Sequence, residues 1–560
     1  MSSLEHSLAL DMNTYEDEFT QLLQRFESST SYIEQQQYFE EINRHRFYFE
    51  ASLNFARLQY YLELTNEKHK ETYLYLTKLE PRYLQLVTSY YRTILNATYR
   101  NGLEQHYGKQ LFLLAEIKQS SYSKEVEKEI NKENQLLLEY NQLRASAKIN
   151  FQGNTLNLST ITPYLTNNDR EIRKQAHLAK SEFYKENEDK FDQLLDELVK
   201  IRHSIATKLG YSSFVELGYH RMNRTSNNSE DLRIYRNEVK TVGVPFISKL
   251  KKMQQQRIGV KQLKYYDENY VFPNGLPKPQ GTDEEIMSLL HRMFTELSPE
   301  TKEFFEYMIS KNLMDTESRE HKIGGNFATF ISKDQLPFIF TNFHGTSNDI
   351  RVFTHEAGHA FQFYMSIHWN IPEYLIPYDS CEIFSFAMER LTWPWMELFF
   401  GEETNLYKFS HLTNAFMFMP VASVIDEFEH YLYENPTASI TERKHTWRKF
   451  EKEYLPERDY DDNEFWESGT SFYDFAHLFL SPFYFMDYDL AHFLSVQLWE
   501  KSQTNPNEAW KCFLEMCHHG GHHSFNEHIK SAKLYSPFEE GSLKQLLSSV
   551  EKWIEQNKID

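Results

Sequence analysis

Glycine and proline are scarce in this chain, with only 18 glycines and 17 prolines among 560 residues. Both residue types interrupt helices, so their scarcity leaves long stretches free to be helical. Ser31–Thr65 and Ser123–Leu143 contain neither, and they repeat apolar side chains at three- and four-residue spacing. The sequence therefore predicts a mostly α-helical fold, long enough to bury a large core without disulfides.

The few interruptions suggest how the chain is organised. A polar break at residues 153–168 separates a first helical part, which carries no recognisable chemistry, from the remainder. We therefore expect an N-terminal helical domain at residues 1–165 and a second, chemistry-bearing domain at residues 166–560. Within 324–343, two short β-prone runs flank the polar residues Ser332–Gln335, which predicts a hairpin or part of a small sheet.

Charge and cysteine content limit the classes of partner. The 81 acidic residues outnumber 60 basic ones, giving a formal charge of −21, so nucleic acid and anionic membranes are poor partners. The acidic start, residues 1–18, lacks the pattern of a secretory leader, and no apolar stretch is long enough to span a bilayer. Three cysteines suit a reducing compartment, so we expect a cytoplasmic protein; the sequence leaves its oligomeric state open.

The strongest motif is His355-Glu356-Ala357-Gly358-His359. On a helix, residues four apart share one face, so both imidazoles can bind one metal ion, and Glu356 lies beside them. A chain with 23 histidines can also contain this pattern by chance. A third ligand would strengthen the interpretation, since catalytic zinc usually has three protein ligands and one open position.

Glu382 is the candidate third ligand. It begins a helix-like segment far enough downstream for the chain to turn and return, and its neighbours are apolar. A carboxylate in such surroundings needs a metal or a partner, although a surface carboxylate would have the same spacing. Asp379 or Glu389 could accept the free N–H of a metal-bound histidine. Two histidines and a carboxylate also hold other transition metals, but the glutamate between the histidines favours zinc and hydrolysis, with Glu356 as general base toward a zinc-bound water.

Further stretches resemble one known family. They are Asp169–Ala176, Arg202–Ala206, Leu209–Tyr211, Pro337–Phe343 followed by Gly345-Thr346, and the E-x-x-S-x-x-x-E segment Glu382–Glu389. Together with the His-Glu motif, they make the chain similar to the M3 family of zinc metallopeptidases, in its oligoendopeptidase F-like branch, which is related to thimet oligopeptidase. The resemblance covers roughly residues 167–551.

The resemblance implies a helical peptidase with a deep channel that admits peptides and excludes folded proteins. It implies one zinc ion per chain, with His355, His359 and Glu382 as ligands and Glu356 as the catalytic carboxylate. Donors to the developing oxyanion are implied in a histidine and tyrosine-rich stretch: His477, then Tyr488 as first choice and Tyr484 as second. Pro337–Phe343 resembles the sheet edge that lines the channel, where an extended peptide could add as a strand.

Two features depart from the family pattern or extend it. Many relatives have a histidine at the position of Gln362, but that histidine is not a ligand, so zinc binding should survive. The cluster His518–His523 contains four histidines around two glycines. Adjacent histidines on an extended chain point in opposite directions, so we expect a flexible, substrate-facing loop rather than a second metal site.

The leading hypothesis is a cytoplasmic zinc endopeptidase that cleaves internal bonds of short, unstructured peptides. A zinc aminopeptidase is the alternative within enzymes, although no motif proposes an anionic pocket for a free amine. The alternative that is not an enzyme is a peptide-binding protein with a peptidase fold. The presence of the candidate base and of all three candidate ligands argues against it.

Overall fold

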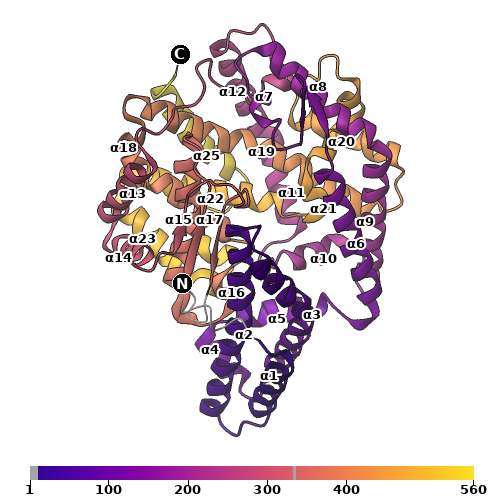
Figure 1. The fold of residues 1–560 in the computed structure, drawn as a ribbon, viewed down its shortest axis with the longest axis vertical. Helices are drawn as coiled ribbons and strands as arrows, with labels where there is room; N and C mark the ends of the chain where they lie inside the picture. The colour runs from indigo at the N-terminus through magenta and orange to yellow at the C-terminus, as the bar shows by residue number, and fades with distance from the viewer. Residues whose placement is uncertain (1–9, 332–335, 560) are drawn as a thin grey trace.

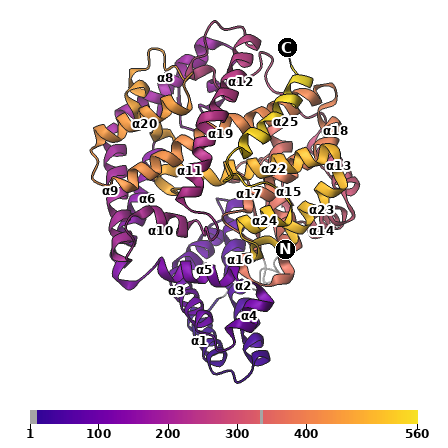
Figure 2. The ribbon, with the colours of Figure 1, turned by 180° about the vertical axis from the view of Figure 1, so that it is seen from behind.

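A computed structural model of the chain describes residues 10–331 and 336–559. The fold is mostly helical, as predicted. The first helices project from a larger body in Figure 1 and, seen from behind, in Figure 2. They are α1 (Met12–Glu27), α2 (Tyr32–Leu62), α3 (Glu67–Leu95), α4 (Arg100–Tyr107) and α5 (Gln110–Ser120).

The larger body contains most of the remaining helices. Its first half holds α6 (Glu127–Ala145), α7 (Thr162–Leu165), α8 (Arg170–Glu186), α9 (Glu188–Lys208), α10 (Phe214–Arg221), α11 (Ser229–Glu238), α12 (Val244–Arg257), α13 (Asp283–Leu297) and α14 (Pro299–Ser310). Its second half holds α15 (Ser347–Ser366), α16 (Pro372–Leu375), α17 (Cys381–Leu391), α18 (Glu397–Phe400), α19 (Thr404–Glu434), α20 (Ile440–Tyr454), α21 (Ala476–Leu480), α22 (Phe485–Thr504), α23 (Pro506–His519), α24 (Phe525–Ser531) and α25 (Ser542–Gln556).

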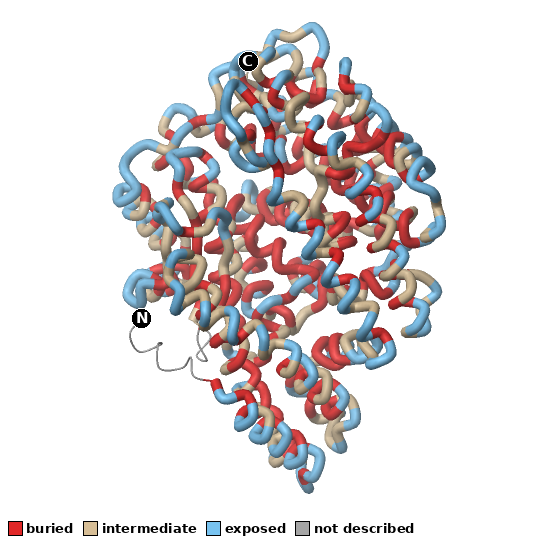
Figure 3. The backbone as a smooth tube through the Cα atoms, turned by 45° about the vertical axis from the view of Figure 1, so that its right-hand side comes forward, coloured by how far each residue is buried: buried red, intermediate tan, exposed pale blue. Residues whose placement is uncertain are grey.

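Buried apolar side chains form two main clusters. One is built almost entirely from residues 10–115, and the other from Val126 onward with Phe55 and Leu58 of α2. Buried backbone fills the centre of the body in Figure 3, whereas exposed segments lie at its periphery. The predicted domain boundary at residue 165 remains a prediction.

A buried ion pair connects the projecting helices to the body. Arg46 of α2 places a guanidinium nitrogen 2.5 Å from a carboxylate oxygen of Glu373 in α16, and Tyr91 of α3 also donates to that carboxylate. Both charged side chains are at least nine-tenths buried. Removing one partner would leave the other charge buried and unpaired, so the pair fixes how α2 and α16 fit together.

A small sheet lies beside α15, which confirms the prediction of a hairpin or part of a small sheet in this region. Strands β4 (Phe327–Phe330) and β5 (Pro337–Phe340) are antiparallel, and β3 (Met314–Asp315) pairs parallel with β5. The residues predicted as the hairpin turn, 332–335, lie outside the described residues. The expectation that Pro337–Phe343 forms the sheet edge is wrong: the strand order is β3-β5-β4, so β5 is central and buried throughout, and β3 and β4 are the edge strands.

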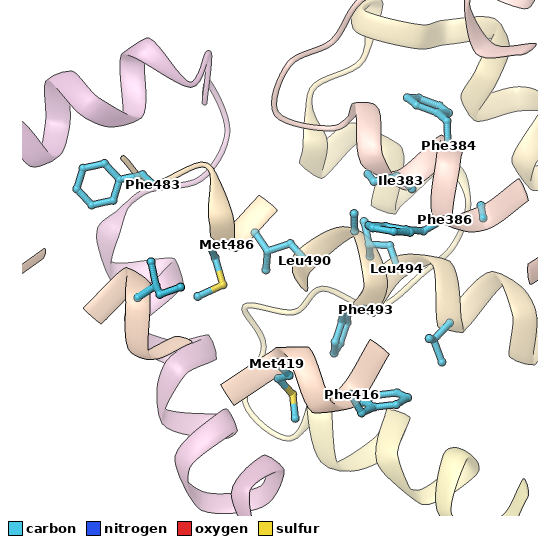
Figure 4. Close-up of a cluster of buried hydrophobic side chains, with 14 of the residues drawn as sticks. Ile383, Phe384, Phe386, Phe416, Met419, Phe483, Met486, Leu490, Phe493 and Leu494 are labelled. Atoms are coloured by element: carbon cyan, nitrogen blue, oxygen red, sulfur yellow. The ribbon is translucent and has the colours of Figure 1, made fainter. Parts of the chain in front are cut away.

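Helix α17 is the structural centre of the body. All eleven of its residues are buried, which is the pattern of a helix surrounded by protein. Figure 4 shows Ile383 and Phe386 of α17 close to Leu494 of α22. Any charged side chain on α17 therefore needs a partner inside the protein.

Within the described ranges, none of the helices combines the length and apolar character required to cross a bilayer. The first nine residues, which begin the acidic segment 1–18, are outside the described part.

Candidate metal centre

Helix α15, which carries the His-Glu motif, begins with a reciprocal cap. The Thr346 backbone and hydroxyl both donate to the Asp349 carboxylate, at 2.9 and 3.1 Å. Asp349 also accepts from the His344 backbone at 2.9 Å. The helix thus starts at Ser347, and Asp349 supplies the capping carboxylate.

Gly358 allows α17 to approach α15 closely. A β-carbon at this position would lie 2.6 Å from the Phe384 carbonyl oxygen and 2.7 Å from the Ser385 Cα. Real β-carbons do not come so close to backbone atoms. Only glycine fits, and it brings the α17 backbone against the histidine-bearing helix.

The three predicted ligands converge. Glu382 Oε2 lies 3.3 Å from His355 Nε2 and 3.6 Å from His359 Nε2, and one donor atom of each residue lies within 4.8 Å of the others. Two donors at the usual zinc distance of about 2.1 Å, separated by a tetrahedral angle, are about 3.4 Å apart. The two histidine–carboxylate separations therefore match a tetrahedral zinc site, and the donor types are those zinc prefers.

Glu389 orients His355 from the opposite side. Its Oε1 lies 2.7 Å from His355 Nδ1, and its Oε2 lies 2.6 Å from His411 Nε2. Trp393 Nε1 donates to His411 Nδ1 at 2.9 Å, and an indole nitrogen is only a donor. Neutral His411 therefore carries its proton on Nε2 and donates it to Glu389. With Nδ1 of His355 bonded to Glu389, Nε2 is the ring nitrogen left to bind a metal once it has lost its proton.

Of the two carboxylates proposed for this role, Glu389 performs it. Asp379 is buried elsewhere, where burial and repulsion from Asp487 raise its pKa to about 7. Sequence reasoning missed His411 and Trp393. Neither belongs to a motif, and His411 comes from α19, so only the tertiary arrangement could have revealed it.

Glu382 is held on both carboxylate oxygens. The Tyr484 hydroxyl donates to Oε1 at 3.1 Å, and the Ser385 hydroxyl lies 3.0 Å from Oε2. The structure thus places Tyr484 next to the third ligand.

The charges of the cluster suit a cation. Burial raises the pKa of Glu382 and of Glu389, but the neighbouring histidines outweigh it and hold both pKa values well below the usual range. Burial lowers the pKa of His355, yet Glu382 and Glu389 raise it to about 10. Two ionised, buried carboxylates attract positive charge to the space between the imidazoles.

Glu356 lies on the side of α15 that faces the sheet edge. Its side chain is buried, and burial raises its pKa, against the attraction of His355 and His359. The backbone of Ala328 in β4 also acts on this carboxylate and lowers its pKa. The candidate base is therefore next to the ligands and next to the edge strand.

His477 and Tyr488 line a cavity of about 480 Å³ beside the ligand cluster. Their ring centroids are 6.0 Å apart, and the Tyr488 ring lies 5.1 Å from that of Tyr484. Glu389, His411 and several aromatic side chains line the same cavity. The structure thus brings every predicted site residue to one region, while their roles stay predictions.

The prediction for His518–His523 assumed an extended backbone, and this assumption is wrong. Helix α23 continues to His519, and a 3₁₀ turn, η10, covers Gly520–His522. Side chains at positions i, i+3 and i+4 of such a segment share one side. One ring nitrogen each of His519, His522 and His523 therefore lies within 4.8 Å of the other two.

Comparison with known proteins agrees with this geometry. The model of peptidase family M3 matches residues 164–547, and that of the M3 N-terminal domain matches residues 8–122. The chain belongs to peptidase family M3. The predicted resemblance is confirmed.

Solved structures of similar proteins cover this M3 peptidase almost completely. PZ peptidase A, solved with an inhibitor, is 42% identical, with a TM-score of 0.90 and 98% of both chains covered. A putative oligoendopeptidase F from Bacillus anthracis str. Ames is also 42% identical, with a TM-score of 0.86 and the same coverage. The oligoendopeptidase F homolog of Borreliella burgdorferi is 23% identical over 375 residues, which span 65% of this chain and 61% of that relative's length.

Proposed function

We propose that this chain is a zinc-dependent endopeptidase that hydrolyses internal bonds of short, unstructured peptides. The observation that carries the proposal is the separation of Glu382 Oε2 from the two histidine nitrogens, 3.3 and 3.6 Å, beside a buried glutamate. Membership of peptidase family M3 supports it.

His355, His359 and Glu382 would hold the ion. Bound zinc polarises a substrate carbonyl and makes water more acidic. Glu356 accepts a proton from the attacking water and passes it to the leaving amine. Glu389 keeps the His355 proton on Nδ1, so that Nε2 remains a ligand.

Tyr488 and His477 donate hydrogen bonds to the carbonyl oxygen as it becomes negative. Both line the cavity next to the ligands, which supports this role. The Tyr484 hydroxyl is instead engaged with Glu382, which supports a role in positioning that ligand.

Strand β4 offers an edge to which an extended peptide can add through main-chain hydrogen bonds. The proximity of Glu356 to Ala328 supports cleavage of a peptide aligned there. Recognition through the backbone requires an extended chain but little particular sequence. It therefore favours unstructured peptides as substrates.

Mass spectrometry of products from N-terminally blocked peptides tests the proposal. We expect internal cleavage that stops with a chelator, returns with zinc, and falls about 10²- to 10⁴-fold in Glu356→Gln at unchanged zinc content. Cleavage only of unblocked peptides would indicate an aminopeptidase. Binding without cleavage by the zinc-loaded chain would indicate a non-catalytic peptide-binding protein.

Three buried, unpaired cysteines support a reducing, cytoplasmic location. The formal charge of −21 supports peptides, rather than nucleic acids or membranes, as partners.

A further inference from the structure

A second group of histidines lies at the end of α23, apart from the His-Glu motif. The rings of His519 and His523 stack with centroids 3.7 Å apart. The His522 ring lies 5.6 Å from His519 and 5.4 Å from His523. One ring nitrogen of each lies within 4.8 Å of the others, so small side-chain movements bring the three donors within reach of a single ion.

Each of these rings has a nitrogen that the protein leaves unused. The Nδ1 atoms of His519, His522 and His523 are buried and make no hydrogen bond in the described structure. Buried polar atoms normally have a partner, so three such atoms in one cluster need an explanation.

The surroundings hold the group in place. The His522 ring stacks on Trp369 at 4.1 Å, and the Trp369 indole donates to the His518 carbonyl at 3.0 Å. On the other side, a β-carbon at Gly108 would lie 2.6 Å from His522 Nε2, so this nitrogen is covered by the segment between α4 and α5. A β-carbon at Gly521 would overlap the Glu373 carbonyl, so glycine there lets η10 lie against α16.

We propose that His519, His522 and His523 form a second site for a divalent transition-metal ion, with zinc as the expected occupant. Three imidazoles are a donor set that zinc, copper and nickel favour. The nearby Glu527 carboxylate accepts from the Ser524 backbone and hydroxyl, both at 2.8 Å, so it is engaged as a helix cap. The site is structural: it fixes η10 against Trp369 and the α4–α5 segment, where the projecting helices meet the body.

Metal stoichiometry of the full chain tests this site separately from the catalytic one. In a His355→Ala/His359→Ala background, we expect one equivalent of zinc to remain after dialysis against micromolar zinc. Adding His519→Gln and His523→Gln should remove it, whereas adding His518→Gln, at an exposed neighbouring histidine, should not. The proposal would be overturned if the variant lacking His519 and His523 still bound one zinc per chain. It would also be overturned if the His355→Ala/His359→Ala chain bound none.

Thermal unfolding and cobalt absorption distinguish a built site from a histidine-rich stretch that chelates metals weakly. Zinc should raise the unfolding temperature of the His355→Ala/His359→Ala chain, and His519→Gln alone should abolish the rise, because only a folded-state site stabilises the fold. Cobalt should give the intense visible bands of a four-coordinate ion in the folded chain only. Equal binding by the urea-unfolded chain would contradict the proposal.

Discussion

The two histidine clusters differ in what surrounds their ring nitrogens. In the motif cluster, Glu389 holds the distal nitrogen of His355 at 2.7 Å, and Tyr484 and Ser385 hold the Glu382 carboxylate. In the η10 cluster, three Nδ1 atoms are buried without partners among the described residues, and the nearby Glu527 carboxylate already caps a helix. Hydrogen bonds orient the motif cluster, and the buried Glu356 lies next to it, which suits the proposed catalysis. The η10 cluster is held by ring stacking and would depend on the proposed ion.

The largest effect should come from Gly358→Ala. The added methyl group overlaps the backbone of α17, so the helices must separate and Glu382 must move from the histidines. We expect peptidase activity to fall at least about 100-fold, because misplacement by about 1 Å has such an effect. The zinc ion of the motif cluster should be lost, while the zinc ion proposed for the η10 cluster should remain.

Gly324→Ala is the matched control, because a β-carbon there meets nothing within 4 Å. Its activity and zinc content should equal those of the unaltered chain. Normal zinc content in Gly358→Ala would show that the close approach does not assemble the ligands.

Tyr488→Phe should reduce kcat about 10²- to 10³-fold, the usual effect of losing one oxyanion donor. Zinc content should not change, because Tyr488 donates to the substrate in our proposal. Kinetics together with metal analysis measure both quantities. Tyr484→Phe is the comparison: it should weaken zinc binding through Glu382, and a kcat defect without zinc loss in that variant would reverse the two assignments.

Glu389→Gln should weaken zinc binding at the motif cluster about 10- to 100-fold, the usual range for removing a ligand's orienting partner. The amide nitrogen cannot accept from His355 or His411, so at least one of the two hydrogen bonds is lost. Competition with a chromophoric chelator measures the affinity. Glu397→Gln, at an exposed glutamate six residues beyond α17, should have no effect.

The smallest effect should come from Gln362→His, which introduces the histidine that many relatives have. Gln362 Nε2 donates to the Ser366 hydroxyl at 2.9 Å, and its side chain lies against Gly520 rather than in the ligand cluster. We expect kcat/KM and zinc content within a factor of about 2, and an unfolding free energy lower by about 1 kcal/mol at most. A third zinc equivalent would contradict this view of the position.

Much of the site was predictable because its chemistry follows local spacing. Helical periodicity placed His355 and His359 on one face, and the apolar neighbours of Glu382 indicated a buried carboxylate that needs a partner. The strand order was also within reach: an uninterrupted apolar run such as Pro337–Phe340 is typical of a central strand, whereas family resemblance suggested an edge.

The remaining features depend on tertiary structure or on backbone conformation. His411 approaches Glu389 from a different helix, and no spacing in the sequence connects the two. The arrangement of His519, His522 and His523 was missed because the prediction assumed an extended backbone. The glycines that suggested mobility instead permit close packing against α16.

Helix α17 carries Glu382 and Glu389 two turns apart, and the two carboxylates contact opposite nitrogens of the His355 ring. A shift of α17 by one residue along or around its axis would move both carboxylates away from His355 at once. In the proposed metal centre, displacement of Glu382 is therefore expected to accompany misalignment of the His355 ring. We therefore expect the proposed metal centre to be lost in a single step, when α17 loses its packing in the core.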